Sequence, residues 1–455
     1  MSGVIDVGVV GAGPAGLAAA LAAGDLGCEV TLIDAGPGPG GQRYHHSLLF
    51  PGAARGAAAG ATEHLPPGLA RIRQVREVRH LAATTVRQAE RGHDGVVTLW
   101  VGGPEGGAET TVEVRAVVLA TGSAEVVLPF PGWDLPGVTT AGAAQALLEG
   151  QGVTMGRRIL VAGSGPRLLP VAAGLAEAGV EVAAVLEAQP AAEGEAAELG
   201  AFPGDPQAAA GHVAALARHG VPVRTGWAVV ACQGTDRVER AVMARLDEDW
   251  RPILGSRREE FVDAVHVSFG FSPALKLPRA LGCATMPDPS GPTAAVTCGA
   301  DMATSVPGVF AAGEVTGVSG ADRVELQGYL AGASAARYLG RLSPVEYEAR
   351  TQPLRARLED VRRLAAGVDE AHPLRPGWLD WPDAGTVVCR CLETYWPEIG
   401  AAVAGGARDV PTVREMTGCG AGHCQGRVCG AALQYAVSAA SGRSLAEVGD
   451  LRTSP

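Results

Sequence analysis

The sequence is poor in charge and almost devoid of lysine. Charged residues make up 19% of the 455 positions, against about 25% in typical soluble proteins, and Lys276 is the only lysine among 37 basic residues. The net charge is −11 and no cluster of basic residues interrupts it, so a nucleic-acid partner is not expected, because phosphates would be repelled. Low surface charge is typical of a chain covered by partner subunits, which indicates a large complex.

Long apolar runs and a secretion leader are also missing. No run approaches the roughly 18 apolar residues of a membrane-spanning helix. Residues 1–10 lack the basic start of a signal peptide and pass directly into an apolar, strand-like run. We therefore expect a cytoplasmic protein with no membrane span of its own. A reducing compartment also favours cysteines that bind metal over cysteines that form disulfides.

Cysteine, in contrast, is concentrated near the carboxyl end, where five of the nine cysteines lie between residues 389 and 429. They form a C-x-C pair, Cys389 and Cys391, followed by Cys419, Cys424 and Cys429 with four residues between neighbours. Four converging thiolates are what a [2Fe-2S] cluster needs, and the intervening glycines let the backbone wrap around it. Four cysteines also suit zinc, but zinc ribbons favour C-x2-C pairs. The spacing favours an iron-sulfur cluster, with a zinc site and unliganded core cysteines as alternatives.

The beginning of the chain has the pattern of a dinucleotide-binding βαβ unit. Strands are predicted at 4–10 and 29–33 and a helix at 17–26, with the loop Gly11-Ala12-Gly13-Pro14-Ala15-Gly16 between the first strand and the helix. Gly11 permits the tight turn, Gly13 lets a pyrophosphate approach the backbone, and Gly16 lets the helix pack on the strand. Asp34 ends the second strand, where a carboxylate can bind a ribose hydroxyl.

Four further segments resemble flavoproteins of the glutathione reductase type, and this resemblance implies FAD at the first site. They contain Gly41 and Gln42, in a loop at the flavin; Val86, in an adenine-contacting segment; Ala120, Thr121 and Gly122, at a strand end; and Gly313 and Glu314, in the second flavin motif. The family usually has Asp at the position of Glu314, but the longer acid can still reach a ribitol hydroxyl. Its disulfide-reducing members carry two cysteines after a Gly-Gly. This chain has none after Gly40-Gly41, so disulfide reduction is not expected.

A second βαβ pattern follows the first. Strands are predicted at 158–161 and 181–186 around a helix at 168–178, with the loop Gly163-Ser164-Gly165-Pro166. Leu168 replaces the third glycine, which should push the helix off the strand or change how the loop closes, and Glu187 stands at the ribose position. We expect a second nucleotide here, with NAD(H) as the default. A vestigial fold or a different ligand is the alternative.

These patterns predict an α/β protein with two Rossmann-like dinucleotide-binding domains of the glutathione reductase type and a small helical C-terminal [2Fe-2S] domain. The length also suggests about three domains. The predicted ranges are 1–145 and 285–340 for a discontinuous FAD-binding domain, 150–284 for the second nucleotide-binding domain, 341–384 for a charged linker with a helix at 355–364, and 385–440 for the cluster domain with helices at 397–404 and 409–416.

Three runs spread along the chain resemble one family. They are residues 131–145, PGWDLPGVTTAGAAQ; residues 165–170, GPRLLP; and residues 424–429, CQGRVC. All are similar to the family of the opine oxidase A subunit and the hydrogen cyanide synthase B subunit, and the α subunits of D-hydroxyproline and proline dehydrogenase complexes are similar too.

The C-terminal part resembles bacterioferritin-associated ferredoxin domains. This resemblance implies Cys389, Cys391, Cys424 and Cys429 as the four cluster ligands. Spacing alone would also admit Cys419, which is as far from Cys424 as Cys429 is. The chain departs from the family pattern at Leu392 and Gly418, where the family commonly has Glu and Arg, and this puts local hydrogen bonding to the cluster in doubt.

The resemblance also implies a function. In such complexes a partner flavoprotein of the D-amino-acid-oxidase type removes hydride from an amine carbon, and a subunit like this one carries the electrons onward, in some complexes with a small ferredoxin-like subunit. We therefore expect a hetero-oligomer, and we predict no catalytic side chain in this chain. One alternative is a self-sufficient NAD(P)H-dependent flavin reductase that passes electrons through its own cluster. Another is a scaffold in which the nucleotides and the cluster are structural.

Overall fold

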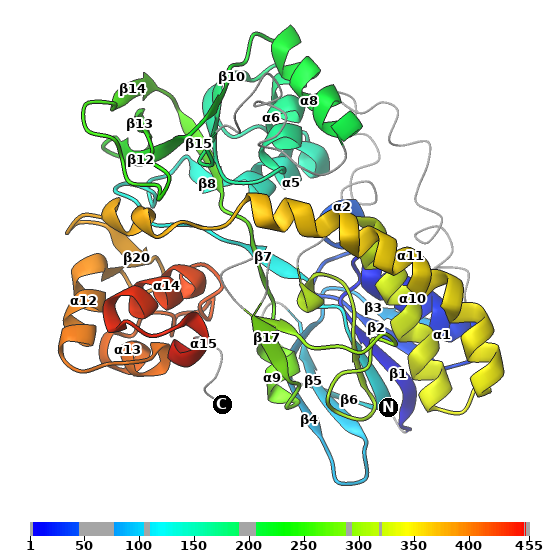
Figure 1. The fold of residues 1–455 in the computed structure, drawn as a ribbon. Helices are drawn as coiled ribbons and strands as arrows, with labels where there is room; N and C mark the ends of the chain where they lie inside the picture. Colours follow the sequence, from blue (N-terminus) through cyan, green and yellow to red (C-terminus); the bar gives the residue numbers. More distant parts are fainter. Residues whose placement is uncertain are drawn as a thin grey trace.

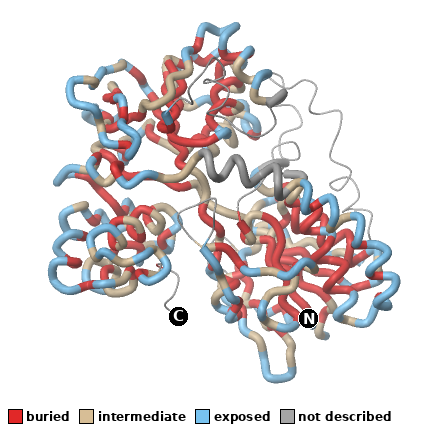
Figure 2. The backbone as a smooth tube through the Cα atoms, viewed as in Figure 1, coloured by how far each residue is buried: buried red, intermediate tan, exposed pale blue. Residues whose placement is uncertain are grey.

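The computed structural model describes residues 3–44, 77–103, 110–190, 206–287, 294–317, 321–449 and 451. Figure 1 shows them as two sheet-centred domains and a small helical module beside them. Figure 2 shows that burial is concentrated on the sheets and on the helices that face them. Among the described residues, no helix is both long enough and apolar enough to cross a lipid bilayer. The predicted α/β fold class is confirmed.

The first domain is built on a seven-stranded sheet in the order β3-β2-β1-β6-β5-β4, with β19 paired to the last three residues of β6. Its strands are β1 (Ile5–Val10), β2 (Val30–Ile33), β3 (Val78–Leu81), β4 (Thr85–Arg91), β5 (Val97–Gly102), β6 (Thr110–Leu119) and β19 (Val309–Ala311). The β1, β2, β3, β6 and β19 strands run parallel, and β4 and β5 extend the sheet antiparallel. The apolar residues of β1 and β6 are buried on both faces, as central parallel strands require.

Two helices with small residues at their interface cover this sheet, α1 (Pro14–Asp25) and α10 (Ala321–Tyr338). A Cβ atom at Gly328 would lie 2.2 Å from the carbonyl oxygen of Ala15, and one at Gly332 would lie 2.3 Å from that of Ala19. These glycines let the helices approach closely, which carries the segment after β19 back onto the first glycine loop. The first domain is therefore closed by a segment more than 300 residues along the chain.

The second domain has a parallel five-stranded sheet in the order β11-β10-β9-β15-β8. Its strands are β8 (Val138–Thr140), β9 (Arg158–Gly163), β10 (Glu181–Glu187), β11 (Val223–Thr225) and β15 (Ala264–Ser268), and its helices are α5 (Ala141–Gln151), α6 (Leu168–Glu177) and α8 (Pro206–Arg218). An antiparallel sheet of β12 (Trp227–Gln233), β13 (Arg240–Arg245) and β14 (Arg258–Phe261) completes it.

The chain passes between the two domains through two strands that pair with each other, β7 (Ser123–Glu125) and β16 (Phe271–Pro273). The crossings therefore come earlier than the predicted boundaries at residues 145 and 285. After the first crossing, β8 joins the second sheet. After the second, Leu277 of α9 (Lys276–Ala280) joins the apolar core of β4 and β5. The hairpin of β17 (Thr285–Pro287) and β18 (Ala294–Val296) follows.

The predicted linker begins as one long helix, α11 (Pro344–Ala371), which continues through Pro353. It runs along α10 and then toward the second domain (Figure 1). The short 3-10 helix η3 (Pro376–Asp380) follows, and here Trp378 and Trp381 are buried in the core of the second domain. The end of this segment is thus part of a core, which its charged composition did not indicate.

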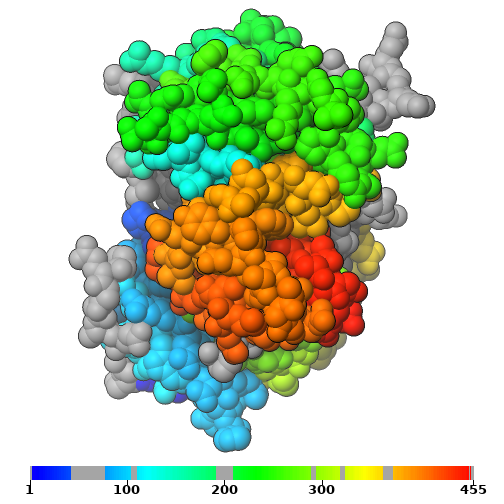
Figure 3. All heavy atoms as spheres, turned by 90° about the vertical axis from the view of Figure 1, so that its left-hand side faces the viewer, coloured from blue at the N-terminus to red at the C-terminus, as the bar shows by residue number. Residues whose placement is uncertain are grey.

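The C-terminal module contains β20 (Val387–Cys389), β21 (Thr394–Tyr395), α12 (Trp396–Ala404), α13 (Val410–Thr417), α14 (Gly430–Ser441) and α15 (Leu445–Val448). The helices predicted at 397–404 and 409–416 correspond to α12 and α13. The indole N–H of Trp133 donates to the carbonyl of Val387 at 2.6 Å, and the Arg390 guanidinium lies 4.6 Å from the centre of the Trp133 ring. Figure 3 shows the module seated between the second domain and the β4–β5 end of the first.

Candidate cofactor and cluster sites

The first glycine loop has the close backbone contacts that its sequence predicts. Gly11 has a φ of +103°, and a Cβ atom there would lie 2.2 Å from the carbonyl oxygen of Ala120. A Cβ atom at Gly16 would lie 1.7 Å from the carbonyl oxygen of Gly11. The α1 helix starts with Pro14 and has no side-chain cap on its N-terminus, so its first N–H groups are available to a phosphate.

Asp34 lies against this loop. One carboxylate oxygen accepts the N–H of Ala12 and the other accepts the N–H of Gly36, both at 2.6 Å. The backbone N–H of Thr84 donates to the carbonyl of Asp34 at 2.8 Å. This contact brings the segment before Val86, predicted to contact adenine, to the residue predicted to bind ribose. Val86 itself is buried in β4.

The loop with Gly40 and Gly41 packs against the first glycine loop. The N–H of Gly40 donates to the carbonyl of Ala12 at 2.7 Å, and a Cβ atom at Gly41 would lie 2.7 Å from the Cα of Gly13. The φ of Gly41 is +57°, so both its conformation and its contact favour glycine. Gln42 follows and is exposed.

Glu314, in the predicted second flavin motif, is held from both domains. Its carboxylate accepts the hydroxyl of Ser123 at 2.5 Å and lies 3.2 Å from Nη2 of Arg167. Arg167 comes from the second glycine loop and stacks over the ring of Phe271 at 4.3 Å. The pairing of Arg167 with Glu314 was not predicted, because the two residues are 147 positions apart and nothing local in the sequence signals their contact.

Two further predicted segments flank Glu314. The hydroxyl of Thr121, between Ala120 and Gly122, donates to the carbonyl of Ala274 at 3.0 Å, which joins the end of β6 to the second crossing strand. The N–H of Gly313 donates to the buried amide oxygen of Gln327 at 2.9 Å. The predicted FAD residues from 11 to 16, Asp34, Gly41, residues 120–122 and residues 313–314 thus converge on the carboxyl ends of β1, β2, β6 and β19. Ligands bind at this edge in open parallel sheets.

The second glycine loop is equally close-packed. Gly163 has a φ of +147°, and a Cβ atom there would lie 1.7 Å from the carbonyl oxygen of Ser268. Gly165 precedes Pro166 and donates its N–H to Glu187 at 2.8 Å. Leu168, in place of a third glycine, begins α6 and is fully buried in the core that α6 forms with α5 and α8.

The end of the linker covers Glu187. The side chain of Glu187 is fully buried, and its second oxygen accepts the N–H of Gln189 at 2.8 Å. Nε2 of His372 lies 4.0 Å from the carboxylate, and the Gln189 amide donates to the carbonyl of Pro373 at 2.8 Å. Burial raises the pKa of Glu187, and the nearby His372 opposes that shift. The residue predicted to bind a ribose therefore contacts the chain itself.

The five cysteines of the C-terminal module fall into two neighbouring groups. The sulfur atoms of Cys389, Cys419 and Cys429 lie within 4.8 Å of one another, and all three residues are buried. Cys391 hydrogen-bonds to Cys424, and both are less buried. The thiols of Cys419 and Cys429 donate to Cys389, which holds the pKa of Cys389 well below its ordinary value. We name these the buried trio and the outer pair.

The sulfur atoms of the module are arranged so that they could hold a metal ion or a two-iron cluster. Each iron of a [2Fe-2S] cluster binds two thiolates, so the cluster needs two adjacent pairs, whereas zinc needs four ligands around one point. The buried trio and the outer pair supply two adjacent sets. A Cβ atom at Gly422 would lie 2.3 Å from the Cβ of Cys391, so this glycine is needed for the loop to approach the C-x-C pair.

The two departures from the ferredoxin pattern have different surroundings. Gly418 ends α13 in the left-handed region, with a φ of +74°, where an arginine would be strained. Leu392 is 48% exposed, and its neighbour Cys391 lies 3.8 Å from Nε2 of His423. The outer pair therefore lies beside exposed apolar surface and a histidine.

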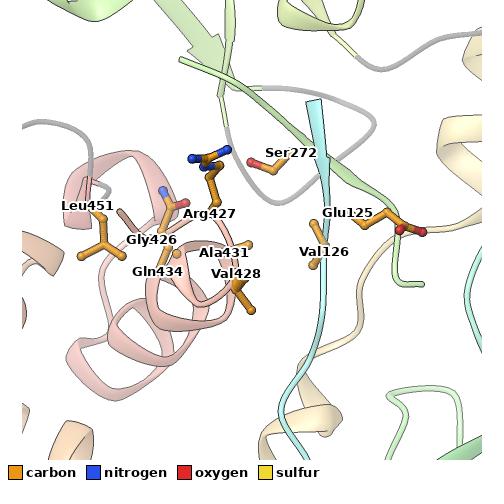
Figure 4. Close-up of a pocket in the computed structure, with 10 residues that line it drawn as sticks. Glu125, Val126, Ser272, Gly426, Arg427, Val428, Ala431, Gln434 and Leu451 are labelled. Atoms are coloured by element: carbon orange, nitrogen blue, oxygen red, sulfur yellow. The ribbon is translucent and has the colours of Figure 1, made fainter. Parts of the chain in front are cut away.

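The loop that carries Cys424 and Cys429 lies next to the domain crossing. Nζ of Lys276, the only lysine, donates to the side chain of Gln425 at 2.8 Å, and burial lowers the pKa of Lys276, with Arg427 and Arg87 adding to the effect. Figure 4 shows the cleft between this loop and the crossing strands, with Arg427 turned toward Ser272 and Glu125 turned away from the module. The cleft holds about 20 Å³, which is room for about one water and not for a nucleotide.

Comparison with known proteins gives matches along nearly the whole chain. The family model described as pyridine nucleotide-disulphide oxidoreductase matches residues 5–340. Hydrogen cyanide synthase subunit HcnB of Pseudomonas aeruginosa is 31% identical over 432 residues, covering 92% of this chain and 90% of the relative. The A subunit of opine oxidase from Agrobacterium tumefaciens is 31% identical over 461 residues, covering 99% of this chain and 89% of the relative. The predicted resemblance to these subunits is confirmed.

Solved structures support the fold. L-proline dehydrogenase from P. horikoshii superimposes with a TM-score of 0.64 at 19% identity, covering 98% of this chain and 76% of that one. T. acidophilum thioredoxin reductase superimposes with a TM-score of 0.54 at 18% identity, covering 74% of this chain and 99% of that one. The two-domain arrangement is thus common to proteins of different activity.

Proposed function

Because the chain belongs to the pyridine nucleotide-disulphide oxidoreductase family, we propose that it is the electron-transferring FAD and [2Fe-2S] α subunit of a heteromeric amine or imino-acid dehydrogenase. The relatives that match along most of the chain bear the names of subunits, and one of them belongs by its name to an enzyme that oxidises opines. Opines, D-hydroxyproline, proline and glycine-like amines are the substrate classes we propose, oxidised in a partner flavoprotein of the D-amino-acid-oxidase type.

The observation that carries the proposal is the position of the cysteine loop beside the first domain. Lys276 opens α9, which packs on β4 of that domain, and its ammonium group holds Gln425 between Cys424 and Cys429. A bound FAD accepts two electrons and can release them singly, and a bound [2Fe-2S] cluster carries one electron at a time. One chain therefore carries the residues proposed for both groups.

Residues of this chain would hold the cofactors in the following way. The N-terminus of α1, after Gly13, would bind the pyrophosphate, and Asp34 would accept a hydrogen bond from a ribose hydroxyl. Glu314, bound by Ser123, would accept a hydrogen bond from the ribitol chain. Cys389, Cys391, Cys424 and Cys429 are the proposed cluster ligands. We assign no substrate base to this chain.

The test is activity with and without the partner. The purified chain should carry FAD and about two iron atoms and two sulfides. With an amine and a dye as electron acceptor, the chain alone should show little turnover. Co-expression with an amino-acid-oxidase-like flavoprotein of the same organism should raise turnover at least tenfold. Reduction of dye by NADH with the chain alone would favour a self-sufficient flavin reductase, and zinc in place of iron would contradict the proposal.

A further inference from the structure

The C-terminal module contains one more converging thiol than a [2Fe-2S] cluster binds. The outer pair, Cys391 and Cys424, offers two sulfurs to one iron. The other iron has two positions to fill and three sulfurs within 4.8 Å of one another, those of Cys389, Cys419 and Cys429. One buried thiol therefore remains after the cluster has four ligands.

Backbone structure divides the buried trio. The three thiols are all hydrogen-bonded to one another, so hydrogen bonding does not rank them. Cys389 ends β20 and is fixed by the strand pairing with β21. Cys419 and Cys429, which lie outside strands, are therefore the two that compete for a single position.

Cys419 and Cys429 lie in different backbone structures. Cys429 immediately precedes α14, and its carbonyl accepts the N–H of Leu433 in the first turn of that helix. Cys419 lies between Gly418 and Gly420, which have φ angles of +74° and +83°, and its N–H bonds to the hydroxyl of Thr417 at 3.1 Å. A cysteine between two glycines can move its sulfur with little cost in backbone strain, whereas one at a helix start cannot.

We propose that Cys419 is a reserve ligand that exchanges with Cys429 at the inner iron. The inference rests on the cluster assignment in the proposed function. In the exchange, the Fe–S bond to Cys429 breaks, a bond to Cys419 forms, and the thiol proton of Cys419 passes to the sulfur of Cys429. The number of electrons and the total charge are unchanged, so no oxidant or reductant is needed. Whichever thiol is displaced keeps its S–H directed at Cys389, where hydrogen bonds to ligand sulfur tune the cluster potential.

Iron content and the spectrum of the reduced cluster test the exchange. Cys419→Ala and Cys429→Ala should each retain more than half of the wild-type iron and sulfide, because one sulfur remains for the position. The double variant should lose the cluster, because a single sulfur then remains for two positions. Cys232→Ala, at a buried cysteine in the second domain, is the matched control and should keep all of it. The electron paramagnetic resonance signal of Cys429→Ala should differ from wild type, because its ligand has changed.

Cys429→Ser is a second variant for the case in which Cys429→Ala prevents the module from folding, because serine is close to cysteine in volume and polarity. Its absorption spectrum should show all-sulfur ligation by Cys419. A blue shift from an oxygen ligand would overturn the exchange, as would an iron-free Cys429→Ala or Cys419→Ala in a wild-type background that carries the cluster. Wild-type protein without iron would overturn the proposed function as well, so the two failures are distinguishable.

Discussion

The two nucleotide folds of this chain share a plan and differ in what covers them. In each, a carboxylate after the second strand accepts a backbone N–H of the glycine loop, Asp34 from Ala12 at 2.6 Å and Glu187 from Gly165 at 2.8 Å. Asp34 is half-buried, whereas Glu187 is fully buried beneath His372 and the Gln189 contact to Pro373. A glycine loop can therefore keep its local geometry while a distant segment covers the carboxylate at the predicted ribose position.

The largest expected difference between the two loops is in FAD binding after a methyl group is added to each. Gly13→Ala should fold normally, because the nearest atom to the new Cβ is 3.9 Å away and the backbone is extended there. It should weaken FAD binding by roughly 100-fold, about 3 kcal/mol, because the methyl group stands where the pyrophosphate approaches. FAD titration of the apoprotein and its melting temperature check both statements.

Gly165→Ala is the counterpart in the second loop. Its Cβ would meet nothing within 4 Å, although the φ of +117° costs an alanine about 1–2 kcal/mol of stability. FAD binding should be unchanged. Equal loss of FAD in the two variants would show that the loops are not functionally different.

The pH dependence of stability should also distinguish the second domain from the first. His266 is fully buried in β15 of the second domain, and burial lowers its pKa from 6.5 to about 4. Below pH 6.5 the unfolded chain takes up a proton that the folded chain does not, so this contribution to stability is present above pH 6.5 and is lost as the pH falls toward 4. The loss can reach about 3 kcal/mol.

Denaturant unfolding of wild type and His266→Gln from pH 7.5 to pH 4.5 measures this contribution. The variant should show a smaller fall in the free energy of unfolding, because Gln does not titrate. Glu187 is in both proteins, so its own pH dependence cancels in the difference. Parallel curves for the two proteins would mean that folding does not shift the pKa of His266 from about 6.5.

Removing the contacts that cover Glu187 should have a moderate effect on NADH binding. The wild-type chain should bind NADH with a Kd weaker than about 1 mM, which corresponds to less than about 4 kcal/mol. Gln189→Ala removes the bond to Pro373, worth about 1 kcal/mol, and with His372→Ala should tighten NADH binding roughly fivefold. NADH fluorescence measures the change. Arg375→Ala, exposed on the same segment, is the control and should bind like wild type. Tight binding to the wild type would contradict the role given to the linker.

The sequence predicted the parts of this comparison that depend on local pattern. Both βαβ units, the glycines at positions 11 and 16 and the helices between the cysteines follow from short-range periodicity and from contacts that tolerate no side chain. The expected FAD residues also converge on one sheet edge. The strand order makes that possible, because the carboxyl ends of parallel strands lie together.

What the sequence did not reveal depends on residues far apart in the chain. The Gln189 contact to Pro373 spans 184 positions, and Trp133 binds the carbonyl of Val387 across 254. The composition of the linker predicted a surface segment because its charged helix dominates that composition. Its end is nevertheless anchored by Trp378 and Trp381, which are buried in the core of the second domain. Spacing likewise could not rank Cys419 against Cys429, since only the fold brings both sulfurs to Cys389.

The smallest expected effect concerns the residue that links the two loops. Arg167 belongs to the second loop, yet its guanidinium pairs with Glu314 of the first site. The Arg167 side chain is 51% exposed, so the ion pair itself should be worth less than about 1 kcal/mol. Arg167→Met should therefore weaken FAD binding by no more than about fivefold. Arg167→Lys should restore most of the affinity if charge is what matters. Stopped-flow measurement of FAD association at two salt concentrations would separate charge from packing on Phe271. If the loss of FAD affinity persists at high salt, the contribution of Arg167 comes from its stacking on Phe271. The second domain would then support the first site by packing and not by charge.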